Sequence, residues 1–231
     1  MALNGQVTDD AGFIPWVSLM GPKRAPVRLA RLYNWMERRS SELSFVIHTW
    51  GTTEEDRALE FPCESYFEPP LYGYYRAIEV LAPSDVVFRW LCQLRVGTYG
   101  GFDLIDNFGR RSPRELTPGA DQLESGQRIL TMFELVEFAH GESISMRAAM
   151  PFSLFFGQVG VTYRVVPSGA SRCRIVTRAV APVKGHAWRR ELFPIAELQL
   201  MRSQLQTLKQ LAEKQYLEEL VLAGRPLPDS P

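Results

Sequence analysis

The sequence predicts an α+β fold in which a curved antiparallel β-sheet wraps around one long C-terminal α-helix. Three observations support this prediction. An apolar stripe near the C-terminus recurs at three- and four-residue steps, four segments before it alternate between apolar and polar residues, and two short helical segments precede those. A strand, two helices, an antiparallel run and a closing helix are typical of the α+β class.

The C-terminal stripe predicts a helix over residues 189–217. Such a helix would be about 42 Å long, enough to cross a whole sheet, so the sheet is expected to curve around it. The apolar residues on the stripe are Ile195, Leu198, Met201, Leu205, Leu208, Ala212 and Tyr216. The polar residues off the stripe, which are expected to face solvent, include Arg202, Gln204, Gln206, Lys209, Glu213 and Lys214.

Two hairpins are predicted before this helix, formed by residues 127–138 with 142–150 and by residues 158–166 with 172–182. In the last strand, alternation separates two faces. One face carries Cys173, Ile175, Thr177 and Ala179, and the other carries Arg172, Arg174, Val176 and Arg178.

The first half of the chain predicts one strand over 75–80 and a helix that opens after Pro83. The buried face of this helix is expected to contain Val86, Val87, Trp90, Leu91 and Leu94. A second short helix is predicted over 99–107. Residues 45–70 are rich in proline and aromatic residues, and we expect a wrapping segment with little regular structure.

These elements divide the chain into three predicted parts. Residues 1–47 are an N-terminal extension with one short helix from Pro26, residues 48–217 are the main domain, and residues 218–231 are a C-terminal tail. No role for residues 1–47 follows from the sequence. Capping the open side of the domain and mediating a homodimer are both left open.

The composition excludes several classes of function. Twenty-six basic and 26 acidic residues cancel, so no nucleic-acid partner is expected. Cys63, Cys92 and Cys173 are odd in number and widely spaced, which favours free thiols in a reducing compartment. We find no metal-ligand spacing and no sign of a cofactor. With no secretory signal and no apolar run near about 18 residues, the expected protein is soluble and cytoplasmic, without stable membrane insertion.

Several short stretches resemble one bacterial branch of a known superfamily. Residues 48–55 (HTWGTTEE) look like its lead-in, and Arg76-Ala77-Ile78 with Ala82-Pro83 looks like its first strand and helix. The most distinctive match runs from Tyr99 through Phe102-Asp103 and Ile105-Asp106-Asn107 to Gly109-Arg110-Arg111-Ser112. Residues 205–213 resemble its last helix. The chain thus resembles the helix-grip superfamily of START domains and birch-pollen allergens, in its polyketide cyclase/dehydrase-like branch.

This resemblance implies a helix-grip fold with a cavity between the sheet and the long helix. Similar proteins use that cavity for lipids, sterols, polyketides or hormones. The leading hypothesis is therefore a binder of a small hydrophobic, lipid- or polyketide-like molecule. The expected ligand-binding residues are Tyr99, Asp103, Asn107, Phe133, Met146, Tyr163, Leu198 and Met201. An aromatic residue often follows the signature tyrosine in this branch, whereas this chain has Gly100-Gly101.

Two alternatives remain open. In an enzyme of the cyclase or dehydratase type, a buried Asp103 or Asp106 would be the general base and Tyr99 would polarise a carbonyl. The plainer interpretation is that Asp106 and Asn107 end a helix. In a lipid carrier, the apolar segment Phe152–Phe156 would dock at a membrane, whereas the plainer interpretation is that it folds back onto the core.

The three histidines, His48, His140 and His186, are isolated and are expected in solvated loops.

Overall fold

A computed structural model describes residues 44–100, 111–183 and 187–226, without the side chains of residues 155, 156 and 187–196. The chain divides into two compact units, Met1–Ser44 and Phe45–Pro231. The second unit contains the elements described below.

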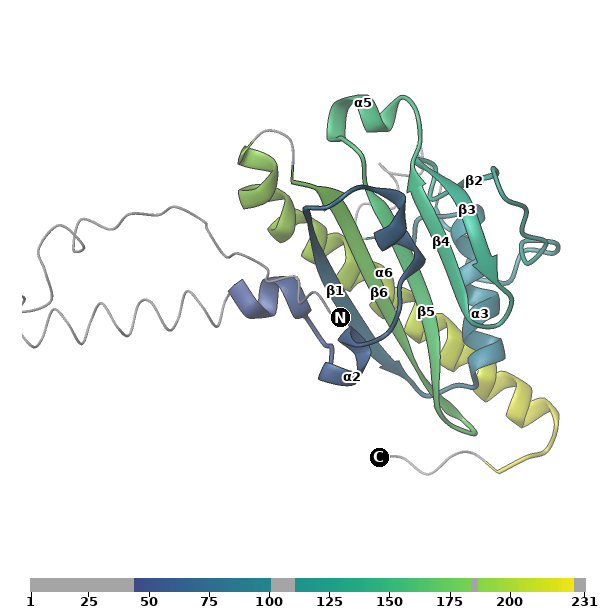
Figure 1. Cartoon of the computed structure of the whole chain (residues 1–231). Coiled ribbons are helices and arrows are strands. Elements are labelled where there is room, and N and C mark those ends of the chain that lie inside the picture. The colour runs from purple at the N-terminus through teal and green to yellow at the C-terminus, as the bar shows by residue number, and fades with distance from the viewer. Residues whose placement is uncertain (1–43, 101–110, 184–186, 227–231) are drawn as a thin grey trace, which may run out of the picture. The chain divides into compact units, whose positions relative to one another are not determined.

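A six-stranded antiparallel sheet forms the centre of this unit, in the order β1-β6-β5-β4-β3-β2 (Figure 1). Its edge strand β1 pairs along its whole length with β6, so the last strand of the sequence lies beside the first. The strands are β1 Leu71–Val80, β2 Arg128–Ile129, β3 Phe133–Ala139, β4 Ser143–Ala148, β5 Gly160–Gly169 and β6 Arg172–Pro182.

The long helix α6 (Ala187–Leu222) crosses one face of the sheet, which we call the inner face (Figure 1). Helix α3 (Ser84–Cys92) packs beside it, and the 3-10 turn η3 (Gln93–Arg95) follows α3. The five-residue helix α5 (Phe152–Phe156) connects β4 to β5. The residues between α6, α3 and the inner face form the main core, which includes Val87, Leu91, Ile144, Met146, Tyr163, Ile175, Leu205 and Leu208.

This architecture confirms the predicted α+β helix-grip fold, a curved antiparallel sheet around a long C-terminal helix. The predicted strand over 172–182 coincides with β6. All five residues predicted for the buried face of the helix after Pro83 are buried, although Leu94 lies in η3 and not in α3. The predicted helix over 189–217 is longer, because α6 begins at Ala187 and ends at Leu222.

The prediction of one strand over 127–138 is wrong. The chain reverses direction at Leu130 and Thr131, whose φ angles of 50° and 63° lie in the left-handed region, and this reversal separates β2 from β3. A left-handed non-glycine residue costs about 1–3 kcal/mol, so another contact must hold it in place. Leu130 is buried, and its backbone N–H donates to the carbonyl of Leu94 at 2.8 Å. No local pattern in the sequence signals this contact between distant segments.

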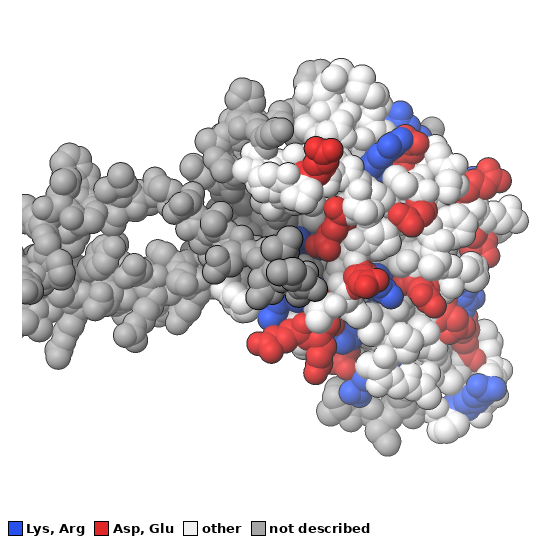
Figure 2. Space-filling view, in the orientation of Figure 1, with Lys and Arg blue, Asp and Glu red and all other residues white. Residues whose placement is uncertain are grey.

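The segment before β1 wraps across the outer face of the sheet, as predicted, but it is more regular than expected. Residues 44–49 are helical, and they are followed by α2 (Glu54–Arg57) and the 3-10 helix η2 (Pro62–Tyr66). Phe61 and Cys63 pack on Ala77 and Val176 of the outer face. Figure 2 views this side, where acidic and basic side chains are both scattered over the surface.

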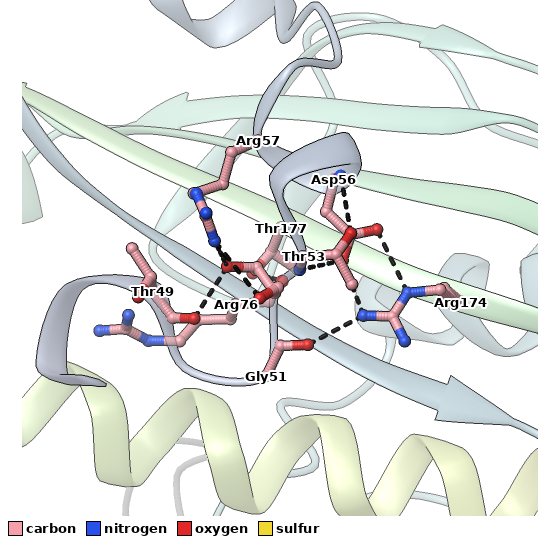
Figure 3. Close-up of polar contacts among 9 residues, drawn as sticks. Thr49, Gly51, Thr53, Asp56, Arg57, Arg76, Arg174 and Thr177 are labelled. Carbon is pink, nitrogen blue, oxygen red and sulfur yellow. Dashed lines mark hydrogen bonds and ion pairs between the residues drawn. The ribbon is translucent and has the colours of Figure 1, made fainter. Parts of the chain in front are cut away.

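The predicted arginine face of β6 holds this wrapping segment. Arg174 forms an ion pair with Asp56 at 2.7 Å and donates to the carbonyl of Gly51 at 2.8 Å (Figure 3). Arg178 pairs with Glu64 at 2.8 Å. The inward side chains of β6 therefore build the core, and its outward arginines attach the segment that covers the other face.

Gly51 lies where this segment closely approaches strand β1. Its φ is +74°, and a Cβ atom there would lie 2.1 Å from the carbonyl oxygen of Ala77 on β1. The Ala77 N–H donates to the carbonyl of Trp50 at 3.0 Å. Only glycine fits this close approach without moving the backbone.

Neutralising Asp56 is expected to loosen the wrapping segment. Burial alone would raise the pKa of Asp56, but its hydrogen bonds with Arg174 and Thr53 outweigh burial and hold the pKa below its usual 3.8. Because charged hydrogen bonds contribute about 1.5–3 kcal/mol each, we expect Asp56→Asn to lower the free energy of unfolding by about 2 kcal/mol at pH 7. Urea denaturation measures this loss, and faster proteolysis of residues 51–66 locates it.

The exposed Glu55 of the same helix provides the control, since Glu55→Gln removes an equal charge. A group with a lowered pKa stabilises the fold above its unfolded pKa and loses that effect as pH falls through the folded value. The difference between wild type and Asp56→Asn should therefore persist down to about pH 4 and vanish below it. Equal losses for Glu55→Gln and Asp56→Asn would contradict this account.

Candidate functional site

An arginine occupies an inward-facing position on β1. Tyr74 and Val80 of this strand belong to the main core, whereas Ala77 belongs to the outer cluster. By this alternation Arg76 points toward α6, and its side chain is 1% exposed. Figure 3 shows its guanidinium extending away from Arg174 and Asp56 of the outer face.

A glutamate on α6 balances this charge. Glu197 is 8% exposed and forms an ion pair with the Nη2 atom of Arg76. The other terminal nitrogen, Nη1, donates to the carbonyl of Tyr75 at 2.8 Å. The guanidinium also lies over the ring of Tyr74, 5.3 Å from its centroid. A buried charge pair of this kind is costly to desolvate and requires further hydrogen bonds to offset that cost.

Those further hydrogen bonds are incomplete among the described residues. Arg76 Nε, Glu197 Oε1 and Tyr74 Oη are buried and have no hydrogen-bond partner there. An unpartnered buried polar group costs about 1–3 kcal/mol, and more for a charged group. Unpartnered groups on three neighbouring side chains therefore require an explanation, such as a bound water or a polar group of a ligand.

Burial controls the protonation of this cluster. It raises the pKa of Glu197 to about 7, although the neighbouring Arg76 opposes the shift. Burial also raises the pKa of Tyr74 and that of Tyr163, and the charge of Glu197 adds to both shifts. Both phenols therefore stay neutral, and the Glu197 carboxyl can exchange a proton near neutral pH.

A second polar chain lies one to two turns further along α6. The Tyr163 hydroxyl donates to Gln204 Oε1 at 2.6 Å and lies 3.6 Å from the sulfur of Met201. Gln204 Nε2 in turn donates to the carbonyl of Thr98 at 2.6 Å. This chain is satisfied throughout, so it fixes the α6 register against β5 and the loop after α3.

The prediction that Gln204 faces solvent is wrong, because it is 6% exposed. The buried stripe of α6 is rotated relative to the predicted one, toward Glu197, Gln204 and Leu211. These residues recur at seven-residue spacing, which keeps them on one side of a helix. The sequence contains this seven-residue spacing, but two of the three residues are polar, so the spacing does not form an apolar stripe.

The predicted ligand-binding residues fall into three groups, which are buried, half-buried or outside the described residues. Met146, Tyr163 and Tyr99 are buried in the main core, whereas Phe133, Leu198 and Met201 are half-buried. Tyr99 lies in a loop, with φ 56°, so the predicted helix does not include it. Its backbone N–H donates to Ser112 Oγ at 3.0 Å, and its ring meets Trp90 edge-on. The remaining predicted site residues, Asp103, Asp106 and Asn107, lie outside the described residues.

The apolar segment Phe152–Phe156 and the histidines agree with their predictions only in part. In α5, Phe152 packs against Phe133 with ring centroids 5.9 Å apart, whereas Leu154 is 66% exposed. His48 lies in the helical residues 44–49 and contacts the Tyr74 ring at 5.3 Å, and His140 is exposed beside Phe88. His186 lies outside the described residues.

Within the described ranges, no three side chains of the metal-binding types gather into a cluster. In the same part of the chain, no helix has the length and apolar character to cross a membrane.

Comparison with known proteins finds similarity in solved structures alone. No protein-family model and no curated protein matches the sequence. The chain is similar to norcoclaurine synthase from Thalictrum flavum, with 12% identity, a TM-score of 0.36 and coverage of 68% of this chain and 90% of that one. It is also similar to an aromatase/cyclase from Streptomyces sp. R1128, with 15% identity, a TM-score of 0.38 and coverage of 68% of this chain and 100% of that one. A protein from Mesorhizobium loti is similar as well, with 12% identity, a TM-score of 0.41 and coverage of 62% of this chain and 98% of that one.

At these identities and TM-scores the similarity concerns the fold, and no ligand or reaction is taken from it. The helix-grip resemblance noted in the sequence is supported by the strand order and by the position of α6.

Proposed function

We propose that this protein binds a small, largely apolar molecule between the inner face of the sheet and α6. The buried polar cluster of Arg76, Glu197 and Tyr74 carries this proposal, because its unpartnered atoms lie among apolar core residues. A ligand group that hydrogen-bonds there would remove a cost that the protein otherwise bears. Ligand sites commonly combine apolar walls with a few polar groups in this way.

The apolar part of the ligand would contact α6 and the neighbouring strands. Leu198 and Met201 are half-buried on α6, directly after Glu197, and Met201 reaches the Tyr163 hydroxyl on β5. Phe133 on β3 is half-buried against the same core. These three side chains keep accessible surface, and Leu198 and Met201 do so within about one turn of Glu197 on α6, as side chains that contact a ligand do.

Enlarging Leu198 is expected to block binding. With the neutral dye Nile red as the probe, we expect Leu198→Trp to weaken binding at least tenfold, because the indole would occupy the space of the dye. Titration followed by fluorescence measures the affinity. The free energy of unfolding should change by less than about 1.5 kcal/mol, as expected for a partly accessible position.

The matched control is Leu200→Trp, which adds the same ring at an exposed position on the same helix. Its affinity for Nile red should equal that of the wild type. No saturable dye binding by the wild type, or equal effects of the two tryptophans, would refute the proposed function. Native mass spectrometry of freshly purified protein would then identify any molecule that it retains.

The two alternatives stay predictions. The enzyme hypothesis depends on Asp103 and Asp106, which lie outside the described residues. The carrier hypothesis has one supporting observation, the exposure of Leu154 and Met150 at α5. Phe152 instead faces the core, so only part of the apolar segment is free to meet a membrane.

A further inference from the structure

The Arg76–Glu197 pair has no net charge when Glu197 is ionised, above about pH 7. One guanidinium and one carboxylate cancel, and each is more than nine-tenths buried. A ligand that reaches this pair therefore meets both signs of charge at hydrogen-bond distance of each other. This differs from a lone buried arginine, which would favour a carboxylate or phosphate.

The unpartnered atoms define which hydrogen bonds a ligand can make. Arg76 Nε carries an N–H and can only donate, whereas Glu197 Oε1 can only accept when the carboxyl is ionised, as it is at pH 8. The Tyr74 hydroxyl can do either. The complementary ligand group must therefore offer both an acceptor and a donor, as a primary amide, a hydroxyl or an enol does.

An anionic head group satisfies only part of this cluster. A ligand carboxylate could accept from Arg76 Nε and from Tyr74, but it would bring a second negative charge beside Glu197 and would leave Oε1 unpartnered. Like charges in a desolvated site repel strongly, since little water screens them. Among the described residues, no second arginine or lysine joins this ion pair to offset that repulsion.

We propose that the Arg76–Glu197 pair selects ligands whose polar end is neutral and both donates and accepts hydrogen bonds, and that Glu197 is the residue that rejects carboxylates. The inference rests on the proposed binding function and specifies its ligand class. Glu197 is then a specificity residue, and it contacts the ligand through Oε1.

Two probes that differ only in the head group test this inference. Dodecanamide and dodecanoate share one apolar chain, and each can be titrated against the protein–Nile red complex at pH 8. We expect the wild type to bind dodecanamide at least tenfold more tightly than dodecanoate. In Glu197→Gln the carboxylate is gone and the amide can donate to an anion, so the ratio of the two affinities should shift at least tenfold toward dodecanoate.

Two further variants make the result specific. Glu218→Gln removes an exposed carboxylate from the same helix and should keep the wild-type ratio. Tyr74→Phe removes one hydrogen-bonding group and should weaken dodecanamide severalfold while the protein still binds Nile red. The wild-type ratio and Tyr74→Phe together test the inference even if Glu197→Gln does not fold.

The outcomes separate the two proposals. If Nile red binds but the wild type does not distinguish the probes, prefers dodecanoate or takes up neither, the head-group inference is overturned and the binding function stands. The same holds if Glu197→Gln and Glu218→Gln give the same ratio. If Nile red itself does not bind, the proposed function fails, and the inference fails with it.

Discussion

Replacing Glu197 by leucine at pH 8 is expected to lower the free energy of unfolding by about 3–5 kcal/mol, the cost of leaving a buried charge without its partner. Arg76 would remain in the core with a permanent positive charge, because a guanidinium does not lose its proton in a protein. Among the described residues, it would keep the hydrogen bond to the Tyr75 carbonyl and the contact with the Tyr74 ring. Urea denaturation followed by tryptophan fluorescence measures the loss.

The reverse substitution should behave differently with pH. Arg76→Met leaves Glu197 unpaired, but a carboxylate can escape this state by taking up a proton. The loss of stability should therefore be large at pH 8 and smaller at pH 5. The loss for Glu197→Leu should instead be larger at pH 5 than at pH 8, because ionisation of Glu197 lowers the stability of the wild type as pH rises through about 7. This difference follows from the chemistry of the two side chains and needs no detail of their packing.

The double variant Arg76→Met/Glu197→Leu completes the test. Apolar replacement of a whole buried pair is often neutral or stabilising, so the double variant should be more stable than either single variant. Additive losses at pH 8 would show that the two side chains are not coupled, and would remove the ion pair from the site. As a surface comparison, breaking the exposed pair Arg89–Glu219 should change stability by less than about 1 kcal/mol.

The overall fold could be predicted from the sequence because its signals are local. The alternation in residues 172–182 separates inward side chains from outward arginines, and each outward arginine at positions 174 and 178 found an acidic partner on the wrapping segment. The buried face of α3 follows from helical spacing alone. In both elements, the spacing of residues along the chain determines which side chains share a face of the strand or helix, and this spacing can be read from the sequence.

The candidate site could be predicted only in part, because its key residues break those same patterns. Tyr163, Leu198 and Met201 were identified as apolar residues on the expected faces. Glu197 and Gln204 were not, since a polar residue on a helix is first assigned to solvent. Their burial is explained by their partners, Arg76 for Glu197 and Tyr163 for Gln204. These partners lie 121 and 41 residues away in the chain.

Arg76 offered one signal that could have been used. It shares one side of the predicted strand 75–80 with Ile78 and Val80, so alternation alone points it inward. A charged residue at an inward position predicts either a buried partner or a bound ligand. The sequence does not say which residue is the partner, because the pairing of β1 with α6 is a property of the folded chain.

The raised pKa of Glu197 gives a pH dependence opposite to that of ordinary paired carboxylates. Its folded pKa is about 7 and its usual value is 4.5, so the folded state binds more protons than the unfolded state between these values. Stability from this group is therefore fully present below pH 4.5 and is lost as pH rises through about 7. Such a shift corresponds to about 3 kcal/mol in all.

Comparison of the wild type with Glu197→Gln isolates this effect, since the variant cannot titrate at this position while other groups titrate equally in both proteins. Asp56 does not interfere, because its lowered pKa puts its titration below this window, and burial raises the pKa of Cys63 to about 11, above it. The stability of the wild type minus that of the variant should fall between pH 5 and pH 8, and then stay level. A difference that rises with pH would mean that Arg76 outweighs burial and holds Glu197 ionised throughout, and the proton exchange assigned to this site would then be wrong.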